Sequence, residues 1–111
     1  MITTHVLDTS KGCPAAGMTV ILEMRLASEW SPIGRGVTGG DGRLDTLTDG
    51  RVLTRGAYRL IFDTGEYHRD QGLTVPFFLE ATITFNVRDP EEHFHLPLLL
   101  SPYGYSTYRG S

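Results

Sequence analysis

The chain has 111 residues, of which 40% are hydrophobic and 21% charged, and its net charge is −3. This length suits one domain, residues 1–111, with a hydrophobic core of its own. The mixed and slightly acidic charge excludes a basic nucleic-acid-binding face, and no apolar run approaches the ~20 residues of a membrane span. The expected partners are therefore small molecules or other protein chains.

The single cysteine and the first residues bear on the compartment. Cys13 has no second cysteine with which to form an intramolecular disulfide. The N-terminal sequence MITTHVLDTSKG lacks the basic and apolar blocks of a secretory signal, so we expect a cytoplasmic protein. No feature around Cys13 indicates an activated thiol, and we interpret it as structural.

Alternating apolar and polar residues predict strands through the first half of the chain. In residues 4–8, THVLD, the alternation puts Val6 inside and His5 on the opposite face. Residues 18–26, MTVILEMRL, form the next strand, with Ile21 as the exception; its inner face is Met18, Val20, Leu22, Met24 and Leu26. SPIGRGVT and AYRLIFD are further candidates, separated by turn-forming clusters such as SKGCPAAG and GGDGR.

The second half of the chain adds a short helix and three strands. TGEYHRDQG predicts about two helical turns ending at Gly72. In FFLEATITFNVR the predicted inner residues are Phe77, Leu79, Ala81, Ile83, Phe85 and Val87. HFHLPLLLS and the closing segment complete the set. So many short strands predict an all-β fold, an antiparallel sandwich of two sheets with about seven to eight strands and one short helix.

The strand HFHLPLLLS has one apolar face and an opposite face that is rich in imidazole toward His95 and apolar toward Leu99. Counting by twos assigns Phe94, Leu96, Leu98 and Leu100 to the core and His93, His95, Pro97 and Leu99 to the opposite face. That opposite face is too apolar for ordinary solvated surface, so we expect it to meet another subunit or a ligand. Tyr103 and Tyr105 follow in the next turn and favour oligomerisation through the last two strands.

Taken one at a time, the candidate metal-binding and catalytic residues do not indicate a particular function. His93 and His95 form half of a metal site to which His5 could add a third ligand, but no cysteine or carboxylate pair accompanies them, and we expect no metal. His5 alone is typical of a surface histidine. Arg43, after the GGDG turn, is typical of a solvated arginine at a strand edge. The chain has no G-x-S-x-G elbow and no phosphate-binding glycine loop.

The ending SPYGYSTYRGS resembles the C-terminal signature of the 5-hydroxyisourate hydrolases, transthyretin-related enzymes of urate breakdown in purine metabolism. THVLDTSKGCPAAGMTV is similar to the N-terminal signature of that family and GRGVTGGDGR to its middle turn, while HFHLPLLLSPYGYSTYRGS is similar to its last two strands. The resemblance covers essentially the whole chain. It implies a transthyretin-like sandwich and a homotetramer, a dimer of dimers, with active sites where the dimers face each other.

The resemblance also implies a set of site residues. His5, Arg43 and His95 match the catalytic residues of the family, and Ser111, which closes the terminal tetrapeptide, is expected to act with them. Substrate binding is expected from His5, Arg43 and the other members of that tetrapeptide, which are Tyr108, Arg109 and Gly110. His93 matches only the flank of its motif and ranks second.

The reaction implied is hydrolysis of 5-hydroxyisourate to 2-oxo-4-hydroxy-4-carboxy-5-ureidoimidazoline, without a cofactor. His5 or His95 would take a proton from water and pass one to the departing ring nitrogen. Arg43 would orient the anionic substrate and stabilise the oxyanion, and Ser111 would order an imidazole or the water. Strand parity puts Tyr108 opposite Arg109, so only part of the tetrapeptide is expected to face the substrate.

Two other classes of function remain open. A non-catalytic, transthyretin-like carrier of small ligands would share the fold and the SPYGYST turn. It would lack the terminal Tyr-Arg-Gly-Ser and have other residues in place of the histidines, both of which this chain keeps. A purely structural module would need none of these groups. The enzyme is therefore the favoured interpretation.

Overall fold

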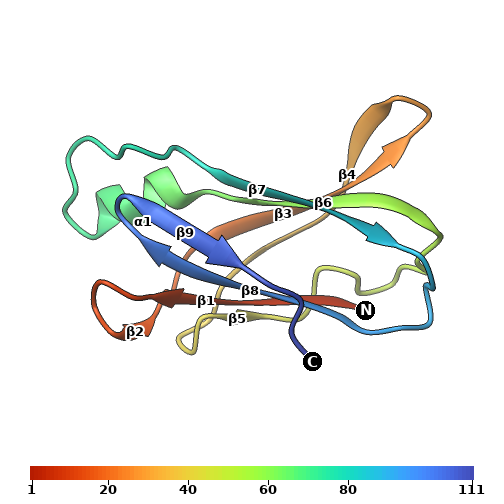
Figure 1. Cartoon of the computed structure of the whole chain (residues 1–111), viewed down its shortest axis with the longest axis horizontal. Coiled ribbons are helices and arrows are strands. Elements are labelled where there is room, and N and C mark those ends of the chain that lie inside the picture. The colour runs from red at the N-terminus through yellow and green to blue at the C-terminus, as the bar shows by residue number, and fades with distance from the viewer.

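A computed structural model describes residues 1–111 as nine strands and one helix (Figure 1). In chain order the elements are β1 (Ile2–Asp8), β2 (Cys13–Pro14), β3 (Thr19–Leu26), β4 (Glu29–Val37), β5 (Arg43–Leu44), β6 (Gly56–Phe62), α1 (Thr64–Asp70), β7 (Ala81–Val87), β8 (Phe94–Ser101) and β9 (Gly104–Thr107). The structure has no helix long and apolar enough to cross a bilayer.

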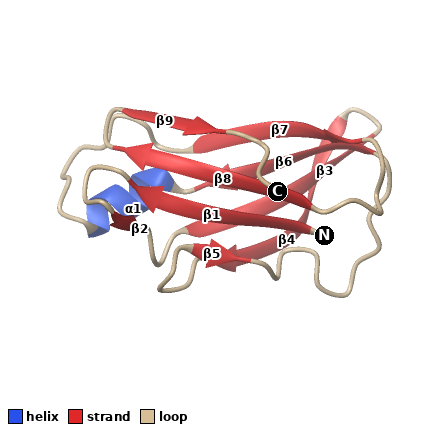
Figure 2. Ribbon diagram, turned by 60° about the horizontal axis from the view of Figure 1, so that its bottom comes forward, coloured by secondary structure: helices blue, strands red, loops and turns tan.

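The strands form two sheets that pack face to face (Figures 1 and 2). One sheet has the order β4-β3-β6-β7, and the other has β2-β1-β8-β9 with the two-residue strand β5 added beside β1. Every pair is antiparallel except β1 with β8, which is parallel along the whole of β1. The predicted all-β sandwich with one short helix is confirmed.

The core lies between the sheets and consists of inward-facing residues of alternating strands. The predicted inner faces are buried at Val6 in β1, at Val20 and Leu22 in β3, and at Leu98 and Leu100 in β8, all of which have no exposed surface. Leu26 is the exception in β3: it is 53% exposed because it lies where the chain turns into β4.

The predicted strand 77–88 begins later than its alternation suggests. β7 starts at Ala81, and Phe77 and Leu79, which we expected in the core, are 68% and 61% exposed. The backbone there bonds to the helix instead: the Gly65 N–H donates to the Leu79 carbonyl at 2.9 Å. Those tertiary hydrogen bonds take the segment out of the sheet, so the expectation was wrong for these two residues.

The short helix is held against β1 by a buried carboxylate. Asp63 caps α1 by accepting from the Glu66 N–H at 3.1 Å, and Tyr67 in the helix donates its hydroxyl proton to Asp8 at 2.7 Å. The other Asp8 oxygen accepts three hydrogen bonds from the loop after β1. Burial raises the pKa of Asp8, but the hydrogen bonds outweigh it and hold that pKa below the ordinary range.

Tyr67→Phe should lower the free energy of unfolding by about 1.5–3 kcal/mol at pH 7, because it removes a hydrogen bond to a buried charge. A carboxyl with a depressed pKa stabilises the fold above its unfolded pKa and loses that contribution as the pH falls through its folded pKa. The gap between variant and wild type should therefore narrow below about pH 4. Urea titrations at several pH values, all at one protein concentration, measure this difference in the free energy of unfolding.

Tyr58→Phe is the matched control. Its hydroxyl donates to the Thr54 carbonyl at 2.7 Å and accepts the Thr54 N–H at 3.1 Å, and both of these groups are uncharged. The loss should be about 1 kcal/mol and should not change with pH. A pH-independent loss for Tyr67→Phe as well would contradict the role assigned to the Asp8 charge.

Candidate active site

The outer face of the five-stranded sheet gathers the predicted site residues. The parallel register of β1 and β8 pairs Thr3 with His95 and His5 with Pro97, while the register of β1 and β5 pairs His5 with Arg43. Residues paired across neighbouring strands point to the same side of a sheet, and so do residues two apart on one strand. All of these side chains therefore face away from the core.

A hollow of about 290 Å³ lies on this face near the two chain ends, which Figures 1 and 2 show on the same side of the molecule. All of its lining residues except Met1 are polar or charged; the others are Thr3, Thr4, Arg43, Asp45, His93, His95 and Ser111. The hollow thus joins residues from β1, β5, β8 and the C-terminal segment. Four of the eight residues assigned to the site from the sequence line it or its rim: Arg43, His93, His95 and Ser111.

His95 is fixed on two sides. Its Nδ1 lies 2.8 Å from the Thr3 hydroxyl oxygen, and its backbone carbonyl accepts the Gly110 N–H at 2.7 Å. A Cβ on Gly110 would lie 2.7 Å from the Cδ2 of His95 and 3.3 Å from the Cγ of Pro97. Only glycine allows the C-terminal segment to approach the imidazole this closely. The remaining ring nitrogen of His95, Nε2, has no hydrogen-bond partner within the chain.

The surroundings keep His95 uncharged near neutral pH. Burial lowers its pKa below the ordinary value, and the positive charge of Arg43 lowers it further, as do His93 and His5 when they are protonated. The Arg43 guanidinium has no carboxylate within ion-pair distance. The site therefore offers a neutral imidazole beside a cation that forms no ion pair, which is the combination needed to take up a proton close to a bound anion.

His5 lies on the same face with a defined tautomer. Its Nε2 is 2.8 Å from the carbonyl oxygen of Asp41, and a carbonyl can only accept, so Nε2 carries the proton and Nδ1 is free in the neutral ring. Asp41 also accepts the backbone N–H of Arg43 at 3.0 Å through its side chain. The turn before β5 thus orients both His5 and Arg43. No group of three or more His, Cys, Asp or Glu side chains has the arrangement of a metal site.

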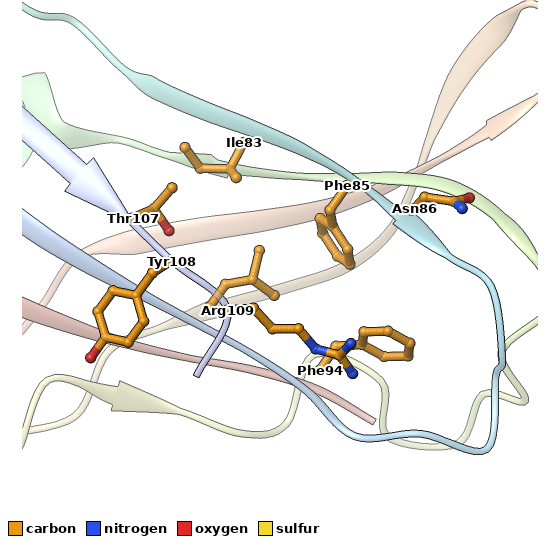
Figure 3. A pocket seen from close by; sticks show the side chains of 8 residues that line it. Ile83, Phe85, Asn86, Phe94, Thr107, Tyr108 and Arg109 are labelled. Carbon is orange, nitrogen blue, oxygen red and sulfur yellow. The ribbon is translucent and has the colours of Figure 1, made fainter. Parts of the chain in front are cut away.

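The terminal tetrapeptide divides between two faces. Gly110 and Ser111 lie at the histidine hollow, whereas the Arg109 side chain extends to the other side, where it binds Glu92 at 2.7 Å and lies 4.9 Å above the Phe94 ring. Figure 3 shows Arg109 reaching toward Phe94, with Tyr108 pointing away from it. The Arg109 guanidinium also donates to the His93 backbone carbonyl at 3.4 Å, but the Arg109 side chain does not line the hollow that holds the imidazoles.

Arg109 and Tyr108 border a second cavity of about 230 Å³ between β7 and the β8–β9 pair (Figure 3). This cavity is lined mostly by apolar residues, among them Ile83, Phe85, Phe94 and Leu96. It holds no histidine and lies at the open edge between the two sheets. We assign the chemistry to the polar hollow, because only there do a base, a cation and a hydroxyl meet.

Four residues that line the hollow were missed from the sequence: Met1, Thr3, Thr4 and Asp45. Thr3 contacts both His93 and His95 through its hydroxyl, at 3.1 Å and 2.8 Å. The available signal was parity, because Thr3 lies two residues before His5 and shares its face. The identity of its partners depended on the register between β1 and β8, which no local pattern encodes.

Comparison with known proteins agrees with this fold. A sequence model described as the HIUase/Transthyretin family matches residues 2–110. The chain belongs to this family. 5-Hydroxyisourate hydrolase 2 of Rhizobium meliloti is 47% identical over 115 aligned residues, which cover 99% of this chain and 95% of that protein. The family resemblance inferred from the sequence is confirmed.

Of two similar solved structures, one is a 5-hydroxyisourate hydrolase and the other is a transthyretin. The 5-hydroxyisourate hydrolase of Klebsiella pneumoniae is 38% identical with a TM-score of 0.87, covering 99% of this chain and 97% of its own. Sea bream transthyretin in complex with thyroxine is 34% identical with a TM-score of 0.90, covering 98% and 93%. The backbone alone therefore does not distinguish a hydrolase from a transthyretin. Sequence identity to curated hydrolases over the full chain supports the expectation that this member is a hydrolase.

Replacing Arg43 by Met should raise the pKa of His95 toward its ordinary value, because the substitution removes a nearby positive charge while keeping a long side chain. Titration of the His95 ring protons by NMR, on protein without substrate, measures this directly. Arg35→Met on β4, in the other sheet, is the control and should leave the titration unchanged. An unchanged His95 pKa in the Arg43 variant would show that Arg43 does not act on this ring.

Proposed function

We propose that this protein hydrolyses 5-hydroxyisourate to 2-oxo-4-hydroxy-4-carboxy-5-ureidoimidazoline, a step of urate degradation, in the hollow on the outer face of the five-stranded sheet. The observation that carries the proposal is the pairing in one hollow of His95, whose Nε2 is free, with Arg43, which forms no ion pair. The full-length similarity to proteins named as hydrolases of this substrate supports it.

His95 is the proposed general base. A lowered pKa keeps its imidazole neutral and able to accept a proton near pH 7. Water attacks a ring carbonyl of the substrate, its proton passes to Nε2, and the same proton then goes to the departing ring nitrogen as the carbon–nitrogen bond breaks. His5, with its free Nδ1 on the same face, is placed to bind the substrate or to assist this transfer.

Arg43 is proposed to bind the anionic substrate and to stabilise the charge that develops on the attacked oxygen. Its exposed guanidinium offers several donors in one plane, which suits an anion with several carbonyl oxygens. The charge on the attacked oxygen grows in the transition state, so a cation that is already in place stabilises that state more than the bound substrate.

The terminal segment completes the site in the proposal. Ser111 contributes a hydroxyl at the hollow, and Gly110 permits close contact with His95. Tyr108 is exposed and borders the second cavity, and its expected contact with the substrate ring is supported by strand parity, which puts it opposite Arg109. Arg109 anchors the segment through Glu92 and Phe94, which is a role different from the substrate contact expected from the sequence.

A carrier function is the second candidate, favoured by one observation, the TM-score of 0.90 with sea bream transthyretin in complex with thyroxine. The two functions differ at the side chains. A carrier needs a pocket that holds its ligand unchanged, whereas this hollow presents a free imidazole nitrogen beside a cation. Ligand binding without turnover would favour the carrier.

We also propose a homotetramer, a dimer of dimers. Tyr103 and Tyr105 are exposed beside Phe77 and Phe78, with ring centroids 6.3 Å (Phe77–Tyr103) and 5.5 Å (Phe78–Tyr105) apart, and Leu99 on the outer face is only partly covered. Exposed apolar and aromatic side chains gathered in this way are typical of subunit contacts. Light scattering after size exclusion should give the mass of four chains at micromolar concentration, and a clean monomer would refute the assembly.

Purified protein should accelerate the decay of 5-hydroxyisourate, generated in place from urate by urate oxidase and followed by ultraviolet absorbance. His95→Asn should reduce kcat by roughly 10²- to 10⁴-fold, the usual contribution of a general base. Decay at the spontaneous rate with folded wild-type protein would refute the proposed function.

Two glycines on the same terminal hairpin give a matched pair of variants for this assay. Gly110→Ala should reduce kcat, because its new Cβ would lie 2.7 Å from the His95 ring and displace it. Gly104→Ala should leave kcat unchanged, since the nearest atom, the Ser101 hydroxyl oxygen, is 3.8 Å away. Equal activity of the two variants would mean that the close approach of Gly110 to His95 has no part in turnover.

A further inference from the structure

The Thr3 hydroxyl lies between two imidazoles. Its oxygen is 2.8 Å from His95 Nδ1 and 3.1 Å from His93 Nε2, and Thr3 itself is only 7% exposed. The two rings are nearly parallel, with an interplanar angle of 16° and centroids 6.3 Å apart. Thr3 is therefore buried, and the two imidazoles are the only hydrogen-bond partners of its hydroxyl, so one of them must accept its proton.

Counting donors restricts the tautomers. A hydroxyl donates one proton and accepts up to two, so Thr3 can donate to only one of the two nitrogens. The other nitrogen must then carry a hydrogen and donate it to the Thr3 oxygen. Either His95 has its proton on Nδ1 and His93 accepts at Nε2, or His93 donates from Nε2 and His95 accepts at Nδ1. The hydroxyl thus ties the tautomer of one ring to that of the other.

The charge on the hollow side favours the first arrangement. Arg43 lines the same hollow as His95 and acts on its ring, whereas Asp45 and the C-terminal residue Ser111, which also line the hollow, form no ion pair with Arg43. In a neutral imidazole the bare nitrogen is the negative end of the ring dipole, so nearby positive charge favours a bare Nε2 with the proton on Nδ1. His93, which is exposed, can accept from Thr3 at Nε2 and keep its own proton on Nδ1 in contact with water.

We propose that Thr3 is a positioning residue for hydrolysis: its hydroxyl donates to His93 Nε2, accepts from His95 Nδ1–H, and thereby holds His95 with a bare Nε2 facing the substrate hollow. The tautomer assignment concerns the protein without substrate and does not depend on turnover, whereas its kinetic consequence rests on the proposed function. His93, which we ranked second among the candidate residues, becomes the acceptor that directs the Thr3 proton.

The protons of this arrangement balance over one reaction cycle. When water loses a proton to Nε2, His95 carries hydrogens on both nitrogens, and its bond to the Thr3 oxygen becomes charge-assisted and stronger. The proton on Nε2 then leaves with the departing ring nitrogen, and His95 returns to its starting tautomer. Thr3 keeps its own proton throughout. The bond is strongest when the ring is charged, so it stabilises the transition state more than the ground state.

The first test is independent of turnover. In wild-type protein without substrate, ¹⁵N NMR of the histidine rings should show His95 with hydrogen on Nδ1. His93→Phe keeps a flat ring but removes the acceptor, so Thr3 is free to donate to His95 Nδ1 and the proton should move to Nε2. His93→Gln keeps an acceptor and should preserve the wild-type tautomer. An Nε2-protonated wild type, or no change in His93→Phe, would overturn the assignment.

The second test is kinetic. Thr3→Val removes the hydroxyl at nearly constant shape and should lower kcat roughly 10- to 100-fold, the range expected for loss of a hydrogen bond to a charged group. KM should change little, because the bond matters most in the transition state. Thr3→Ser keeps the hydroxyl and should restore most of kcat. Thr9→Val is the control, since that hydroxyl donates to the Leu100 carbonyl at 3.0 Å, outside the hollow.

The outcomes separate the two proposals. If Thr3→Ser is as slow as Thr3→Val, or Thr3→Val is as fast as wild type, the positioning role is wrong while hydrolysis stands. If wild-type protein shows the Nδ1-protonated tautomer but no turnover, the proposed hydrolysis fails and the assignment of the Thr3 bridge remains. Because His93 is exposed, its variants report on the tautomer even if Thr3→Val does not fold.

Discussion

The parallel pairing of β1 with β8 is the constraint on which the site depends. It extends over all seven residues of β1, and it is the only parallel pair in an otherwise antiparallel fold. This register sets Thr3 beside His95 and His5 beside Pro97, although about 90 residues of chain separate the two strands. A slip by one residue would turn His95 into the core and bring Leu96 to the surface.

The two edges of β1 have different tasks. On one side β8 supplies the histidines, and on the other the two-residue strand β5 supplies Arg43, which is oriented by the turn at Asp41. The buried Asp8 near the end of β1 binds the helix through Tyr67. One central strand therefore contacts the elements that carry the imidazoles, the cation and the helix, so a local change in β1 would affect the position of all three.

The comparison with transthyretin illustrates how one scaffold serves different chemistry. The backbone of this chain superposes on the hydrolase and on the thyroxine-bound transthyretin almost equally well, with TM-scores of 0.87 and 0.90. A sandwich presents side chains on a rigid outer face without constraining their identity, so function follows from the residues placed there. In this chain the face carries histidines and an unpaired arginine, and the C-terminal segment approaches closely because Gly110 lacks a side chain.

The sequence by itself determined the alternating strands, the helix ending near Gly72 and the opposite faces of Val6 and His5, because side-chain periodicity is a local property of the chain. Its terminal signature determined the family. Tertiary structure alone decided that Phe77 and Leu79 leave the sheet for the helix, and that Arg109 turns toward Phe94 while Gly110 meets His95. Those outcomes, and the Thr3 bridge, depend on contacts between segments distant in sequence, and no local pattern encodes such contacts.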